Sequence, residues 1–100
     1  MQGANRKMDT DGNIVFVHSE NVICCDLDGG KALLDSENSQ YYKLNKTAAL
    51  VWESMSNSNS ANAIAEILCN KFEVSLDQAL VDTKHLLNSM YNAKLIIQKD

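Results

Sequence analysis

The pattern of apolar and polar positions divides the chain into a strand-rich first part and a helical second part. Short apolar runs alternate with polar turns up to Leu44, and beyond Asn45 apolar residues recur about every 3.6 positions. The runs predict four short strands, over Asn13–Ser19, Asn21–Leu27, Ala32–Leu34 and Gln40–Leu44. Because only short turns join the last three, we expect these three to form an antiparallel meander.

Two turns connect the strands of the predicted meander. Asp28-Gly29 favours a tight hairpin of type I′, in which both central residues need positive φ. The second turn lies at Asp35–Ser39, whose short polar side chains can bond to local backbone groups.

Three amphipathic helices are predicted after the meander. Asn45 is a candidate N-cap for a helix over about Lys46–Ser56, and Ser60 for a second helix. Ser75 and Gln78 resemble a capping box for the longest helix, over about Leu76–Asn92. Its predicted core stripe comprises Leu76, Ala79, Leu80, Thr83, Leu86, Leu87 and Met90. Val81, Lys84 and Asn88 lie on one shoulder of this stripe, and Leu95–Ile97 ends the chain as a short extended segment able to pack on the core or pair with a sheet edge.

Length and charge limit the classes of protein that the chain can represent. One hundred residues are expected to form one domain, over residues 13–98, preceded by a polar flexible segment at residues 1–12. A net charge of −4 with scattered lysines disfavours nucleic-acid binding. No apolar run is long enough to cross a bilayer, and no secretory signal is recognised, so we expect a cytoplasmic protein that does not bind membranes.

Little in the sequence indicates catalysis or a cofactor. Cys24 and Cys25 are adjacent and Cys69 is distant, so no ligand spacing for zinc is present, and we expect these cysteines to be core or half-buried apolar groups. His18 and His85 lie in no nucleophile motif, and His85 is expected to face solvent. No metal, cofactor or enzymatic activity is predicted.

The last strand of the meander is the best candidate for a binding surface. Gln40–Leu44 would be an edge strand, with Tyr42 and Leu44 on one face and Tyr41 and Lys43 on the other. Such an edge suits pairing with an incoming peptide. From the residues alone, an equally acceptable interpretation is a short edge whose tyrosines cover the core.

The stretch from Asn21 to Ile96 resembles the PqqD-like family of peptide chaperones, also described as recognition elements for ribosomally made, post-translationally modified peptides. The resemblance rests on Gly30-x-Ala32-Leu33-Leu34-Asp35, Tyr41-Tyr42-x-Leu44-Asn45-x-Thr47-Ala48, Val51-Trp52 and the closing Leu95-Ile96. Two departures are the extra apolar run Ile14–Val17 and Lys94, which stands where the family often has Gly.

The resemblance implies an α+β, winged-helix-like fold in which a three-stranded antiparallel meander precedes three helices. It also implies a non-catalytic adaptor, which binds the leader of a precursor peptide as a further antiparallel strand, in the cleft between the third strand and the third helix. The implied partners are a leader peptidase or another modifying enzyme, and the form of the motif is most similar to leader-binding proteins of lasso-peptide clusters. A subunit serving a radical SAM enzyme and a DNA-binding winged helix are the alternatives; the adaptor could be a monomer or an edge-strand dimer. The expected peptide-binding residues are Gln40, Tyr41, Tyr42, Lys43, Leu44, Val81, Lys84 and Asn88.

Overall fold

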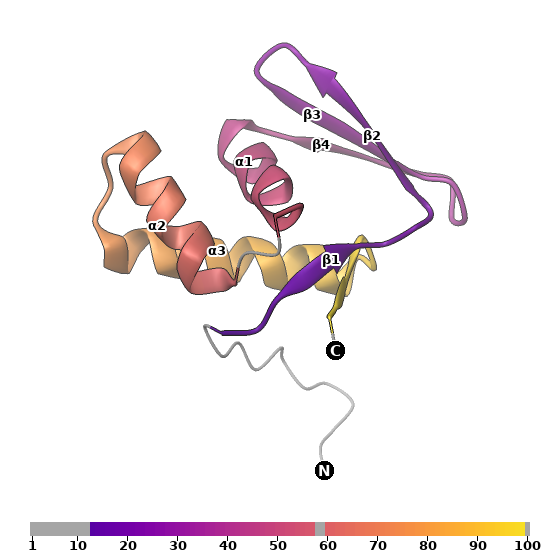
Figure 1. Cartoon of the computed structure of the whole chain (residues 1–100). Coiled ribbons are helices and arrows are strands. Elements are labelled where there is room, and N and C mark those ends of the chain that lie inside the picture. The colour runs from indigo at the N-terminus through magenta and orange to yellow at the C-terminus, as the bar shows by residue number, and fades with distance from the viewer. Residues whose placement is uncertain (1–12, 58–59, 100) are drawn as a thin grey trace.

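The computed structural model describes residues 13–57 and 60–99, and the segment predicted to be flexible, residues 1–12, lies outside the described residues. A three-stranded antiparallel sheet, in the order β2-β3-β4, is followed by three helices (Figure 1). The strands are β2 (Val22–Leu27), β3 (Gly30–Asp35) and β4 (Gln40–Leu44); the helices are α1 (Lys46–Met55), α2 (Ala61–Phe72) and α3 (Leu76–Asn92). The predicted α+β, winged-helix-like fold is confirmed.

The extra apolar run near the N-terminus forms a second, smaller sheet with the end of the chain. β1 (Phe16–His18) pairs antiparallel with β5 (Ile96–Gln98), and Val17 lies opposite Ile97 (Figure 1). Phe16 and Ile96 are both almost fully buried. The extra run therefore leaves both edges of the three-stranded sheet free of other strands in the described part of the chain.

α1 packs against one face of the main sheet, α2 packs against α1 and α3, and the helices and the sheet share a single core. Leu33 in the central strand and Val51 in α1 are completely buried, and Trp52 and Leu87 are buried with them. Tyr42 and Leu44 of β4 are half-buried and pack against this cluster. The inward-facing residues of β4, which alternate along the strand, and the apolar stripe of α1 thus form one apolar layer.

Polar side chains fix the start of each helix as predicted. Asn45, Ser60 and Ser75 each accept a hydrogen bond from a backbone N–H three residues later. The capping box of α3 is only half formed, because the Gln78 side chain donates to Asp82 Oδ1 at 2.9 Å. The N-cap Asn45 lies directly between the end of β4 and the start of α1.

Some local expectations are wrong. In the β2–β3 hairpin only Gly29 has positive φ (85°), so the turn is not type I′. Leu76 is 49% exposed because it is the first residue of α3, one turn before the first buried position. Cys24 and Cys25 are exposed on β2, an edge strand that the core leaves largely uncovered, whereas Cys69 is half-buried as expected. His85 is exposed, as predicted.

Candidate functional site

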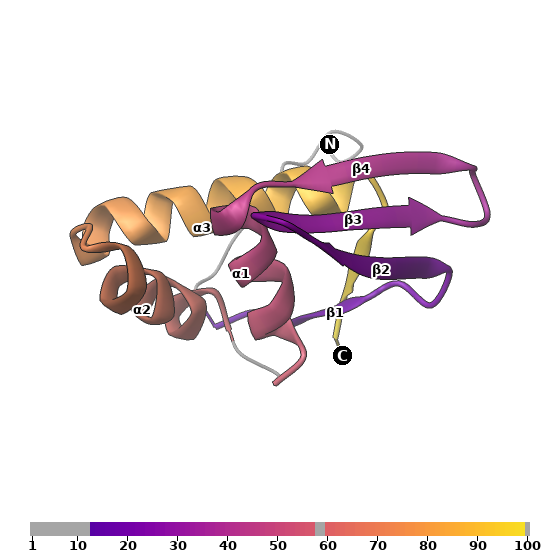
Figure 2. The same cartoon turned by 90° about the horizontal axis from the view of Figure 1, so that it is seen from above.

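β4 presents one free edge along its whole length. The strand pairs with β3 in the register Leu33↔Tyr42, and no described strand lies on its other side (Figure 2). Tyr41 is 61% exposed, and Gln40 and Lys43 are also exposed. The strand therefore offers unpaired backbone groups to solvent, with half-buried side chains beneath and exposed ones above.

A groove of about 380 Å³ separates this edge from α3. It is lined by Tyr42, Lys43, Leu44, Asn45, Ala48, Leu86, Ser89, Met90, Ala93 and Leu95. Most of these side chains are apolar, and the polar ones come from Lys43, Asn45 and Ser89 besides the Tyr42 hydroxyl. A groove of this composition suits apolar side chains of a bound segment better than charged ones.

The helical wall of the groove lies further along α3 than the sequence suggested. The lining residues Leu86, Ser89, Met90 and Ala93 follow one stripe in the last two turns of the helix. Leu86 and Met90 belong to the stripe that the sequence assigned to the core, and nothing in their spacing distinguishes a core position from the floor of a groove. No signal in the sequence could have found them, because the groove depends on how α3 lies beside β4 in the folded chain.

The three predicted helical contacts lie outside the groove lining. Val81 is 61% exposed, and Lys84 and Asn88 are half-buried. Asn88 has one distinctive feature, since its buried Oδ1 accepts no hydrogen bond from the described residues. Their role in peptide binding stays a prediction.

The carboxylate of Asp35 holds the turn that leads into β4. It is 1% exposed and accepts hydrogen bonds from the backbone N–H groups of Glu37 (3.0 Å) and Asn38 (3.2 Å). The side-chain amides of Asn38 (2.9 Å) and Asn21 (2.6 Å) donate to it as well. These hydrogen bonds lower the pKa of Asp35, because each stabilises the ionised carboxylate. The bond from the Asn38 side chain has the largest effect.

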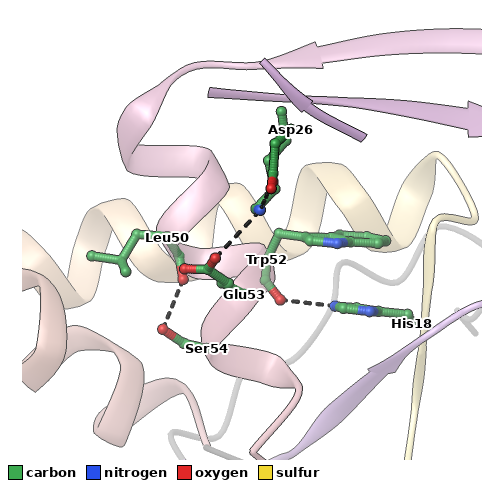
Figure 3. A network of polar contacts seen from close by, with 7 residues as sticks. His18, Asp26, Leu50, Trp52, Glu53 and Ser54 are labelled. Atoms are coloured by element: carbon green, nitrogen blue, oxygen red, sulfur yellow. Dashed lines mark hydrogen bonds and ion pairs between the residues drawn. The ribbon is translucent and has the colours of Figure 1, made fainter. Parts of the chain in front are cut away.

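Polar contacts join α1 to the strands on either side of it (Figure 3). The ammonium of Lys31 on β3 lies 2.6 Å from Asp26 Oδ1 and 3.3 Å from Glu53 Oε2, and the bond with Asp26 is the main cause that raises the pKa of Lys31. His18 lies within 2.8 Å of the carbonyl oxygen of Trp52. Both contacts have a structural role, because they hold α1 in place against the sheet that contains β4.

The described residues contain no group of three or more His, Cys, Asp or Glu side chains that could hold a metal ion. No helix among them is long and apolar enough to span a membrane. A free strand edge beside an apolar groove defines instead a domain that is built to take up an extended peptide.

Comparison with known proteins agrees with this class. The family model described as "Coenzyme PQQ synthesis protein D (PqqD)" matches residues 30–96, and the chain belongs to this family. The solved structure "Lasso peptide synthetase B1 complexed with the leader peptide" is similar, with a TM-score of 0.76 and 27% identity over 82% of this chain and 96% of that one. "TbiB1 in Complex with the TbiA(beta) Leader Peptide" shares the fold, with a TM-score of 0.75 and 19% identity over 80% of this chain and 93% of that one. No curated protein sequence matches the chain.

Proposed function

We propose that the chain is a non-catalytic adaptor that binds the leader of a ribosomally made precursor peptide and delivers it to a leader peptidase or another modifying enzyme in lasso-peptide biosynthesis. The observation that carries the proposal is the free edge of β4 beside the groove along α3. The similarity to a lasso peptide synthetase B1 solved with a leader peptide supports it. Such an adaptor acts in the cytoplasm, where the precursor is made.

The leader would join the main sheet as a fourth, antiparallel strand on β4. Backbone groups of Gln40–Leu44 would form about two to five ladder hydrogen bonds, each of which contributes about 0.5–1.5 kcal/mol net. Since backbone bonds do not discriminate between sequences, side-chain pockets must supply the specificity. Leu86 and Met90 on the groove wall favour an apolar leader residue that points toward the core.

Further side chains of β4 and α3 would help to fix the position of the leader along the strand. On α3 the proposed contacts are Val81, Lys84 and Asn88, which lie outside the lining of the groove. Lys43 and Lys84 would attract acidic leader residues, although each exposed ion pair contributes only about 0.2–1 kcal/mol.

Binding of a candidate precursor leader, chosen from short reading frames that neighbour the gene of this chain, tests the proposal. A fluorescein-labelled leader should bind saturably in an anisotropy titration. A leader with Pro in the middle of the paired segment should lose most of this affinity, because Pro removes a ladder donor. A Pro outside the paired segment is the matched control, and equal affinity of all three peptides would contradict strand addition.

A further inference from the structure

A second hollow, of about 430 Å³, is lined by the β2–β3 hairpin, α1 and the last residues of α2. Figure 1 shows the end of the β2–β3 hairpin close to the start of α1 there. Its lining residues are Gly29, Gly30, Lys31, Lys46, Ala49, Leu50, Glu53, Lys71 and Phe72. Three lysines therefore converge on one hollow from β3, α1 and α2.

The hollow carries unbalanced positive charge in a chain whose net charge is −4. Lys31 is neutralised by Asp26 and Glu53, with its ammonium 2.6 and 3.3 Å from their carboxylates. Lys46 and Lys71 are exposed, and neither forms an ion pair with any residue in 13–57 or 60–99. Two ammonium groups are thus free to meet an anionic ligand.

A further hollow lies between this one and the groove beside β4. This intervening hollow, of about 360 Å³, is lined by Leu27, Asp28, Gly29, Gly30, Lys43, Leu44 and Asn45. It shares Gly29 and Gly30 with the lysine-lined hollow, and Lys43, Leu44 and Asn45 with the groove. The three depressions therefore follow one another around the junction of β4 and α1.

The direction of an added strand decides which part of a leader reaches the lysines. A strand antiparallel to β4 runs from the Leu44 end toward the Gln40 end, so its N-terminal residue lies beside Leu44. Residues that precede the paired segment then leave the groove at Asn45, where the intervening hollow begins. The part of the leader that follows the paired segment leaves at the opposite end, by the β3–β4 turn.

We infer that the hollow around Lys46 and Lys71 receives acidic residues of the leader that lie immediately N-terminal to its paired segment. The inference rests on the proposed function and adds the charge and the position of a second recognition element. Glu or Asp side chains there would pair with Lys46 and Lys71, while apolar parts of the same residues contact Phe72 and Leu50 at the hollow's wall.

Three versions of a leader that binds the chain test the inference, with the four residues before the paired segment changed to Glu, Gln or Lys. In anisotropy titrations at about 50 mM salt, the Glu version should bind about five-fold more tightly than the Gln version and the Lys version more weakly still. The differences should largely vanish at about 500 mM salt, where exposed charges are screened. The double variant Lys46→Glu/Lys71→Glu should reverse the order, and Lys46→Gln/Lys71→Gln should abolish it.

Lys99→Glu is the control, because it makes one of the same Lys-to-Glu changes next to β5, outside the hollow, and should leave the order unchanged. Circular dichroism verifies that each variant is folded. Equal affinity of the three versions would overturn the inference while leaving the adaptor function intact, as would a preference for Glu that survives in the Lys46→Glu/Lys71→Glu variant. Failure of every version to bind would instead refute the adaptor function and the inference with it.

Discussion

The imidazole of His18 lies flat on the indole of Trp52, with 3.6 Å between ring centroids and 5° between ring planes (Figure 3). The Nε2–H of the same ring donates to the carbonyl oxygen of Trp52 at 2.8 Å. Because His18 belongs to β1 and Trp52 to α1, one side chain joins the small sheet to the helix that supports β4. β1, which is additional to the three-stranded sheet and the three helices, is thereby attached to the core.

The stability of the chain should depend on the protonation of His18. Burial lowers the pKa of His18 below its ordinary value of 6.5, and the bond to Trp52 opposes this only in part. Between the folded and unfolded pKa values the unfolded chain binds more protons, so the free energy of unfolding falls as pH is lowered through that window. We expect Tm to decrease between about pH 7.5 and about pH 5.5, measured by circular dichroism.

His18→Gln supplies the control for this pH effect. Glutamine keeps an N–H donor but does not titrate in this range, so the variant should have a lower Tm at neutral pH and a flatter dependence below it. A pH profile as steep as that of the unchanged protein would show that other groups cause the loss.

Gly30 should tolerate no side chain, because β4 passes directly over it. A Cβ at this position would overlap the carbonyl oxygen of Leu44, whose backbone cannot move without displacing the end of β4. We expect Gly30→Ala to lower the free energy of unfolding by about 1–3 kcal/mol, measured by urea denaturation. The neighbouring variant Gly29→Ala introduces strain at φ 85° but meets no atom within 4 Å, and should cost only about 1 kcal/mol. An equal loss in both would contradict a steric cause.

Replacing Lys94 by glycine should stabilise the fold. Lys94 has φ 65° and lies in a Schellman motif, in which its N–H donates to Tyr91 (3.0 Å) and that of Leu95 to Met90 (2.9 Å). Glycine adopts this φ without strain, so Lys94→Gly should raise the free energy of unfolding by about 0.5–1 kcal/mol in urea denaturation. Lys94→Ala removes the same charge but keeps a Cβ, and should give no such gain. Equal effects of the two variants would assign the change to charge.

The turn before β4 should loosen when Asp35 loses its charge. In Asp35→Asn the backbone N–H groups of Glu37 and Asn38 lose a carboxylate acceptor, and we expect faster hydrogen exchange at both amides together with a lower Tm. In the unchanged protein the pKa of Asp35 is lower in the folded state than in the unfolded chain. Ionised Asp35 therefore stabilises the fold fully above its unfolded-state pKa, and this stabilisation is lost as pH falls through its folded-state pKa. Glu37→Gln alters an exposed neighbour and should leave the exchange of both amides unaffected; a matching increase in that variant would count against the role of Asp35.

The sequence predicted the elements well wherever local chemistry determines them. The N-caps Asn45, Ser60 and Ser75 are accurate because a side-chain oxygen and a backbone N–H three residues apart suffice to define each. Cys24 and Leu76 were placed wrongly, because burial depends on which neighbours reach a residue and not on its own apolarity. The pairing of β1 with β5 joins residues far apart in sequence, such as Val17 and Ile97, and no local pattern specifies it.

Part of the candidate site could likewise be predicted from the sequence, and part could not. The edge strand Gln40–Leu44 follows from the strand pattern and the short turns. The groove wall around Leu86 and Met90 could not be predicted, because its position depends on how α3 lies beside β4. The lysines of the second hollow come from three separate elements, and only the folded chain brings them together.

Amide hydrogen exchange of the isotope-labelled chain, with and without a candidate precursor leader, tests the central claim most directly. The sheet has two edges, β4 and β2, and each exposes unpaired backbone N–H groups, so the unused edge is an internal control. We predict that the leader slows exchange at alternate residues of Gln40–Leu44, those whose N–H groups point away from β3, and leaves Val22–Leu27 unchanged. Slowed exchange along β2, or no change along β4 in a saturated complex, would contradict leader binding by strand addition at β4.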